Sequence, residues 1–153
     1  MKERIYVCHT YYHVYVTFLK ELKLLDGREP GSGGCGRATL LLSSLSNNFE
    51  NLKERVESTG LFEAVIPFDE KRVDFFPQLA KWKKGTGGFL GNLLYRIRFT
   101  RLYAKLEADY IPVNFKEYGD VYVYCDSDPI GFYLNQNRIP YHALEDGLNC
   151  LKN

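Results

Sequence analysis

Short apolar runs rich in β-branched and aromatic residues alternate along the chain with longer stretches whose apolar residues recur at helical spacing. This alternation is typical of a βαβ protein. The short runs predict strands at 4–9, 38–44, 62–68, 120–125 and 139–146. The run at 38–44 is apolar without interruption, as expected for a strand covered on both faces, and Pro67 is expected to end the third strand.

The longer stretches predict helices between these strands. They cover residues 12–25, 47–60, 74–84, 89–110 and 128–137. The fold class is therefore α/β: a Rossmann-like three-layer sandwich with a five-stranded, mostly parallel sheet, expected as a single domain over residues 1–153. Right-handed crossovers favour the strand order 3-2-1-4-5, which places a topological switch beside the first strand.

Composition excludes several classes of protein. A formal net charge of +1 gives no electrostatic reason to expect a nucleic-acid partner. The four cysteines show neither CxxC nor zinc-ligand spacing, and no apolar stretch has the length of a signal peptide or a membrane span. We therefore expect a cytoplasmic protein. Most of the 12 tyrosines and 10 phenylalanines are expected in the core, although such rings also suit carbohydrate surfaces.

The turn after the first strand lacks the glycines of a phosphate-binding loop. That turn reads CHTYYH, and no GxxxxGK[ST] motif occurs in the chain. The glycine-rich stretch GSGGCG follows the first helix instead, at the opposite end of the sheet, and is expected to be a connector. The pattern therefore predicts a nucleotide-binding type of fold without its phosphate cradle.

Ligands of open parallel sheets bind beyond the carboxyl ends of the strands, which selects one group of polar residues. These residues are His9, Thr10 and His13 after the first strand, Ser43 and Ser44 after the second, Asp126, Ser127 and Asp128 after the fourth, and Glu145, Asp146 and Gly147 after the fifth. Their shared location predicts a binding site at this edge.

The two adjacent acids are candidates for proton transfer. A carboxylate at the mouth of a strand can take a proton from an attacking hydroxyl. Neighbouring side chains of an extended segment point to opposite sides, so only one of Glu145 and Asp146 can face a given substrate atom. Gly147 permits a sharp turn or the close approach of a ligand. Spacing alone favours the alternative that this triplet is a surface turn.

The histidines are not expected to bind metal. His9 and His13 are four residues apart, but His9 is expected to close a strand, so the two cannot share a helix face, and no third ligand is near in the sequence. Thr10 is a candidate N-cap of the first helix. His142 is expected to be a hydrogen-bonded core residue.

A basic stretch with aromatic neighbours lies in the long predicted helix. It contains Arg96, Arg98, Arg101 and Lys105. Such a helix can lie on an anionic membrane or hold an acidic glycan. The alternative is a solvated charged face.

Two stretches together resemble the bacterial cell-surface sialyltransferases, the group with lipooligosaccharide sialyltransferases and capsule polysialyltransferases. YVCHTYYHVYVTFL is similar to their first strand and helix: Cys8, Thr10, Tyr12 and His13 match, while Tyr11 stands where proline is usual. The triplet Glu145-Asp146-Gly147 resembles their acidic-acidic-glycine motif.

The resemblance implies one lobe of a GT-B glycosyltransferase. The N-terminal lobe would bind the glycan acceptor and supply the general base, Asp146, for inverting sialyl transfer without an obligatory metal or cofactor. His9, Thr10, His13, Asp126, Ser127 and Gly147 would contribute to substrate binding. The donor, CMP-sialic acid, would bind a C-terminal lobe with a His-Pro motif.

No His-Pro dipeptide occurs in these residues. We therefore expect the acceptor-side half of such an enzyme, with the donor lobe absent and the chain inactive alone. Two alternatives stay open: a stand-alone glycan- or protein-binding module without catalysis, and a transferase that uses another activated sugar.

Overall fold

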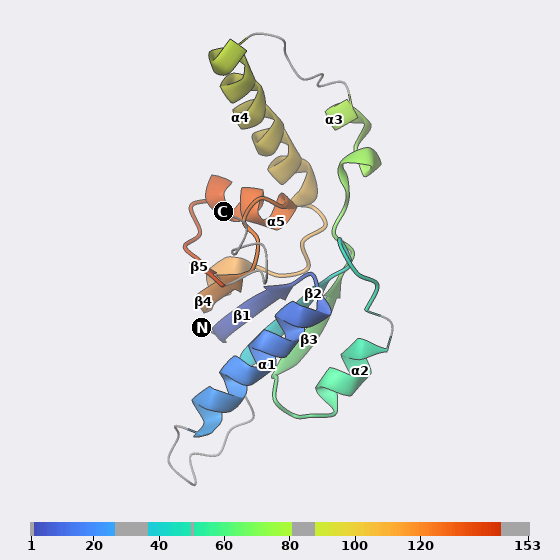
Figure 1. Ribbon diagram of the computed structural model, residues 1–153, viewed down its shortest axis with the longest axis vertical. Helices are drawn as coiled ribbons and strands as arrows, with labels where there is room; N and C mark the ends of the chain where they lie inside the picture. Colours follow the sequence, from blue (N-terminus) through green and yellow to red (C-terminus); the bar gives the residue numbers. More distant parts are fainter. Residues whose placement is uncertain (1, 27–36, 50, 81–87, 145–153) are drawn as a thin grey trace.

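The chain forms a parallel five-stranded sheet with helices on both faces (Figure 1). The computed structural model describes residues 2–26, 37–49, 51–80 and 88–144. The strands are β1 (Lys2–Cys8), β2 (Ala38–Ser43), β3 (Ala64–Phe68), β4 (Tyr118–Val123) and β5 (His142–Ala143). The helices are α1 (Tyr11–Asp26), α2 (Leu52–Glu57), α3 (Pro77–Ala80), α4 (Gly88–Glu107) and α5 (Pro129–Gln136).

The strand order is β3-β2-β1-β4-β5, which confirms the order expected from the sequence. β1 pairs with β2 on one side and with β4 on the other, so the chain reverses its direction of winding at β1. The carboxyl ends of β1 and β4 diverge into helices on opposite faces of the sheet. This is the topological switch point at which such sheets bind ligands.

Alternate residues of the central strands feed two separate cores. Ile5, Val7 and Leu41 point to the face covered by α5, where Ile130 and Leu134 are fully buried. Tyr6, Cys8, Leu40 and Leu42 point to the other face, where Val14 of α1 and Val56 of α2 cover them. The period of two along each strand thus produces the three layers.

A third apolar cluster joins the last turns of α4 to the connection after β3. Phe76, Leu79 and Tyr103 form it, with Phe132 of α5 packed against them. The buried residues of α4 within the described ranges are Tyr103, Ala104 and Glu107, all at this end. The first turns rise away from the body of the protein (Figure 1), with Phe89 82% and Leu90 71% exposed. None of the helices in the described ranges is long and apolar enough to cross a membrane.

The structure corrects several local predictions. Pro67 does not end the third strand but lies within β3, paired in register with Leu42, because β3 is an edge strand and proline is tolerated there. The helix predicted at 47–60 is short, at Leu52–Glu57, and β5 has only two residues. Of the helix predicted at 74–84, Pro77–Ala80 is α-helical and residues 81–84 lie outside the described ranges. The glycine-rich connector lies outside the described residues.

The sequence predicts His142 as a core residue, and this prediction is wrong. The residue lies in β5, but its side chain is 59% exposed and its Nε2 lies 3.1 Å from Oδ1 of Asp120. Because β5 is at the edge of the sheet with little packed over it, position in a strand does not bury this side chain.

Candidate functional site

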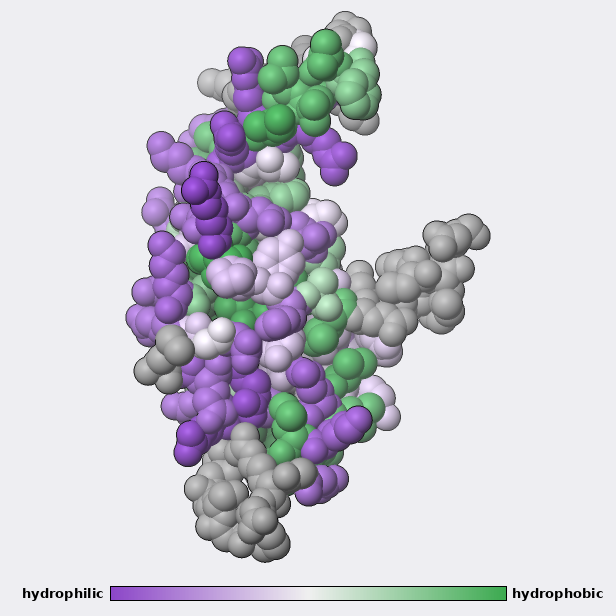
Figure 2. Space-filling view, turned by 90° about the vertical axis from the view of Figure 1, so that its left-hand side faces the viewer, coloured by the Kyte–Doolittle hydropathy of each residue, from purple (hydrophilic) through white to green (hydrophobic). Residues whose placement is uncertain are grey.

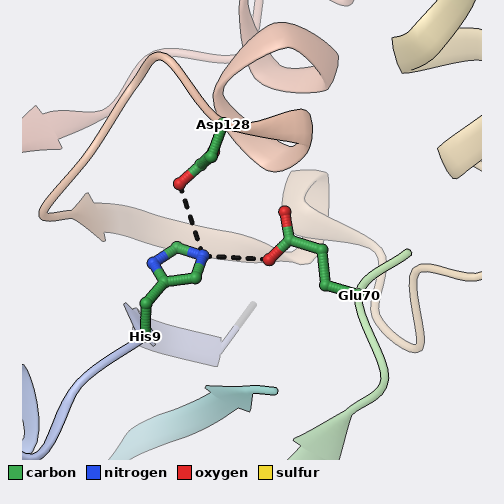
Figure 3. A group of neighbouring side chains, drawn as sticks. All are labelled: His9, Glu70 and Asp128. Carbon is green, nitrogen blue, oxygen red and sulfur yellow. Dashed lines mark hydrogen bonds and ion pairs between the residues drawn. The ribbon is translucent and has the colours of Figure 1, made fainter. Parts of the chain in front are cut away.

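Three buried side chains meet at the carboxyl edge of the sheet, next to the switch point. His9 follows β1, Glu70 follows β3, and Asp128 precedes α5. Nε2 of His9 lies 2.9 Å from Oε2 of Glu70 and 3.3 Å from Oδ2 of Asp128 (Figure 3). Because Nε2 faces two carboxylates, we assign a ring proton to it, and we call the three residues His9, Glu70 and Asp128 the His9 cluster.

Glu70 connects the ends of neighbouring strands with the first turn of α5. The hydroxyl of Ser43, at the end of β2, donates a short hydrogen bond to Oε2 of Glu70. The backbone N–H of Ile130, in the first turn of α5, donates to Oε1 at 3.2 Å. Glu70 is 3% exposed, so its charge depends on these donors and on His9. One carboxylate thus links the ends of β1, β2 and β3 with α5.

Asp128 is the N-cap of α5. Its Oδ1 accepts a 2.7 Å hydrogen bond from the backbone N–H of Gly131, and Pro129 occupies the first helical position, where its missing N–H costs nothing. Burial raises the pKa of the Asp128 carboxyl to about 7, with Glu70 adding to the rise and His9 opposing it. At neutral pH this carboxyl can therefore both accept and donate a proton.

Gly131 brings α5 close to the loop that follows β4. A Cβ atom on this residue would lie 2.2 Å from the carbonyl oxygen of Asp126, which is backbone and cannot move aside. The absence of a side chain at Gly131 thus allows the N-terminus of α5 to reach Glu70 and to hold Asp128 against His9.

His13 and Thr10 organise the turn after β1. The Thr10 hydroxyl accepts from the backbone N–H of His13 at 3.2 Å, which confirms Thr10 as the N-cap of α1. Nδ1 of His13 accepts from the backbone N–H of His9 at 3.1 Å, and its ring stacks on Tyr124 at 4.2 Å. His13 is 2% exposed. The buried ring of His13 therefore fixes the backbone of His9 through this hydrogen bond.

Two pockets open beside the cluster and share Ser127. The Asp128 pocket, of about 640 Å³, is lined by Asp128, Tyr103 and Arg72 among others. The second pocket, of about 760 Å³, lies between α4 and α5 and contains Asp126. Both volumes are in the range of small-molecule sites. Asp126, whose Oδ2 accepts from the Tyr141 hydroxyl at 3.2 Å, and Ser127 are exposed.

A further buried carboxyl, that of Glu107, lies close to the cluster. Oε1 of Glu107 accepts from the backbone N–H of Lys71 at 3.0 Å, while Oε2 is buried without a hydrogen-bond partner within the described part of the chain. Burial raises the pKa of Glu107 to about 7, and the charge of Glu70 adds to the rise. The edge therefore concentrates acidic groups that retain protons near neutrality.

The His9 cluster has the composition of a small metal site. Its three residues each offer one ligand atom, and these atoms lie within 4.8 Å of one another. One imidazole and two carboxylates are a donor set that divalent zinc accepts. Oε2 of Glu70 is already hydrogen-bonded to His9 and to Ser43, and Oε1 of Glu70 and Oδ1 of Asp128 accept from the first turn of α5, whereas Oδ2 of Asp128 is buried without a hydrogen-bond partner among the described residues. The expectation of no metal stays a prediction.

The structure places the sequence-predicted residues in different settings. His9, Asp128 and Ser43 come together in the buried cluster, whereas Asp126 and Ser127 line the neighbouring pockets. Glu145, Asp146 and Gly147 lie outside the described residues. Glu70 was missed, although it follows the third strand at the same edge and the same rule could have selected it.

Comparison with protein-family models, with curated proteins and with solved structures finds no match for this chain.

Proposed function

We propose that this chain is the acceptor-binding lobe of a bacterial glycosyltransferase, which transfers a sialyl group with inversion from a CMP-sugar to a cell-surface glycan. The observation that supports this proposal is the gathering of proton-carrying side chains beside open pockets at the switch point, in a fold whose first turn lacks a phosphate-binding loop. The resemblance of residues 6–19 and 145–147 to the sialyltransferases indicates the type of transfer.

In this proposal Asp146 is the general base that removes the proton from the acceptor hydroxyl. β5 runs parallel to β4, and the backbone N–H of Leu144 donates to the carbonyl of Val123 at 2.8 Å. The described chain therefore ends at the same edge as the His9 cluster. Asp128, whose pKa burial raises to about 7, is the described residue best suited to relay that proton, and His9 lies 3.3 Å from its Oδ2.

The substitution Asp146→Asn tests this assignment in a form of the protein that includes the donor-binding lobe. We expect turnover to fall at least about tenfold, because the amide cannot accept the hydroxyl proton, while binding of the CMP-sugar changes little. Initial rates with a radiolabelled donor and separate donor-binding titrations measure the two quantities. Unchanged turnover would remove Asp146 from the mechanism. The matched control is Asp109→Asn, an exposed acid after α4.

A stand-alone binding module is the second candidate function. The observation that favours it is that the described carboxylates of the His9 cluster are already bonded inside the protein, with Asp128 only 8% exposed, as in a structural network. A glycan-binding signal from the complete natural protein, without hydrolysis or transfer of any CMP-sugar, would identify this function. Transfer from a different activated sugar would instead correct only the donor.

We also propose that α4 places the protein on the inner, anionic face of the cytoplasmic membrane. Its first turns expose Phe89, Leu90 and Leu94, which form an apolar patch at one end of the molecule, with Arg96 and Arg98 following (Figure 2). Apolar side chains beside cations are the surface that binds an anionic bilayer interface.

Sedimentation with vesicles tests this membrane contact. We expect binding to vesicles that contain phosphatidylglycerol at low salt, at least fivefold weaker binding to neutral vesicles, and a similar loss for Phe89→Ser/Leu90→Ser, because both attractions are needed. Leu22→Ser, an exposed leucine of α1, is the control. Equal binding of the two vesicle types, or none, would refute the contact.

A further inference from the structure

The pocket between α4 and α5 is lined by three arginines, and we call it the arginine pocket. Arg96 and Arg101 come from α4, and Arg138 follows α5. Asp126 is the only acid among the described residues that line it. Its volume of about 760 Å³ accommodates a ligand of the size of one or two sugar rings.

Among the residues that the structure describes, the three guanidinium groups take no part in the ion pairs of the fold. Within the described ranges no ion pair or side-chain hydrogen bond joins Arg96, Arg101 or Arg138 to a carboxylate. By contrast, Arg4 forms a two-pronged pair with the buried carboxylate of Glu21, at 2.7 and 2.9 Å. The pocket therefore presents three guanidinium groups that form no ion pair with a described carboxylate, and a guanidinium group can bind a carboxylate or a phosphate with two parallel hydrogen bonds.

Arg138 occupies a position at which the backbone favours glycine. Its φ is 54°, in the left-handed region, where it ends α5: the N–H of Ile139 donates to the carbonyl of Leu134 at 3.0 Å. An arginine in this conformation costs roughly 1 kcal/mol relative to glycine. The fold thus carries a cation at the rim of the pocket at the expense of its own stability.

The remaining walls suit a sugar. Gln136 and Ser127 supply neutral hydrogen-bonding groups, and Phe132 and Ile97 supply apolar surface. Ser127 also lines the Asp128 pocket, so a ligand held by the arginines lies next to the carboxyl whose position the His9 cluster sets.

We propose that the arginine pocket binds the negatively charged group of an acidic sugar, a carboxylate or a phosphate, and holds that sugar beside Asp128. The charge of the ligand follows from the pocket alone. Its identity as the acceptor rests on the proposed function.

Titration calorimetry on the full chain tests this proposal with glucuronate, glucose 6-phosphate and neutral glucose as probes. We expect at least one acidic probe to bind at least tenfold more tightly than glucose, with an affinity that falls as salt is raised from low to physiological concentration. The stronger of the two acidic probes identifies the anion as carboxylate or phosphate. Equal affinities of all three probes, or no binding of either acidic probe, would overturn the proposal.

Arg138→Gly is the sharpest variant, because it separates binding from folding. We expect it to melt at the same or a higher temperature than the parent protein, since glycine suits the backbone, and to bind the acidic probe at least fivefold more weakly. The control is Arg98→Gln, because Arg98 is an exposed arginine of α4, the helix of Arg96 and Arg101, but does not line the pocket. An equal loss in both variants, or no loss in Arg138→Gly, would refute a specific anion site.

This measurement is independent of sugar transfer. If Asp146→Asn leaves turnover unchanged but the acidic probe still requires Arg138, the pocket stands and the transferase assignment fails. If turnover depends on Asp146 but the acidic probes do not bind, the transferase stands and this inference fails.

Discussion

Replacing Glu70 by alanine is expected to lower the free energy of unfolding by about 3–5 kcal/mol. The change removes the partner of His9, of the Ser43 hydroxyl and of the Ile130 N–H at once, and leaves all three polar groups buried. Because these groups come from β1, β2 and α5, the loss is shared by the whole carboxyl edge. Urea denaturation followed by circular dichroism measures it.

Glu63→Ala is the matched control for Glu70. Glu63 precedes the same strand, is exposed and donates only its backbone N–H, to the carbonyl of Ala38. We expect this variant to unfold within about 0.5 kcal/mol of the parent protein. If Glu70→Ala changed the free energy of unfolding as little as Glu63→Ala, the His9 cluster would not contribute to the stability of the fold.

Adding a single methyl group at Gly131 is expected to destabilise the protein by about 2–4 kcal/mol. The new Cβ would meet the backbone of Asp126 at 2.2 Å, so the N-terminus of α5 would have to move away from the loop after β4. That movement would also lengthen the hydrogen bonds that the backbone N–H groups of Gly131 and Ile130 donate to Asp128 and Glu70. Thermal unfolding of Gly131→Ala gives the size of the effect.

Gly91→Ala provides the opposite expectation with the same chemical change. Gly91 lies in α4 with nothing within 4 Å of an added Cβ, so alanine is expected to stabilise that helix by about 0.5–1 kcal/mol. Destabilisation of similar size in both variants would show that close approach of Asp126 is not the reason for glycine at position 131.

The sheet could be predicted because its strands carry their pattern locally. The buried run at Ala38–Ser43 and the alternation in β1 are visible in the sequence, and right-handed crossovers leave few possible orders. The helix lengths could not be predicted in the same way. Asn51 adopts a left-handed conformation with no side-chain cap, so α2 begins only at Leu52. This start depends on the backbone conformation of the preceding turn rather than on helix propensity.

The candidate site could be predicted as a location but not as a set of contacts. His9 and Asp128 follow from the rule that polar residues after parallel strands share an edge. Their mutual contact through Nε2, and the part played by Glu70, depend on the turn after β3 and on the close packing of Gly131. The arginine pocket likewise requires the crossing of α4 and α5, which no local pattern specifies.

Pro67 has a consequence for the behaviour of the protein at high concentration. β3 is an edge of the described sheet, and proline removes one backbone N–H from it. β5, at the other edge, has only two residues, and the side chain of His142 there contacts the carboxylate of Asp120 in β4. Short or interrupted borders of this kind discourage strand addition by another molecule, so this sheet is protected against growth into aggregates.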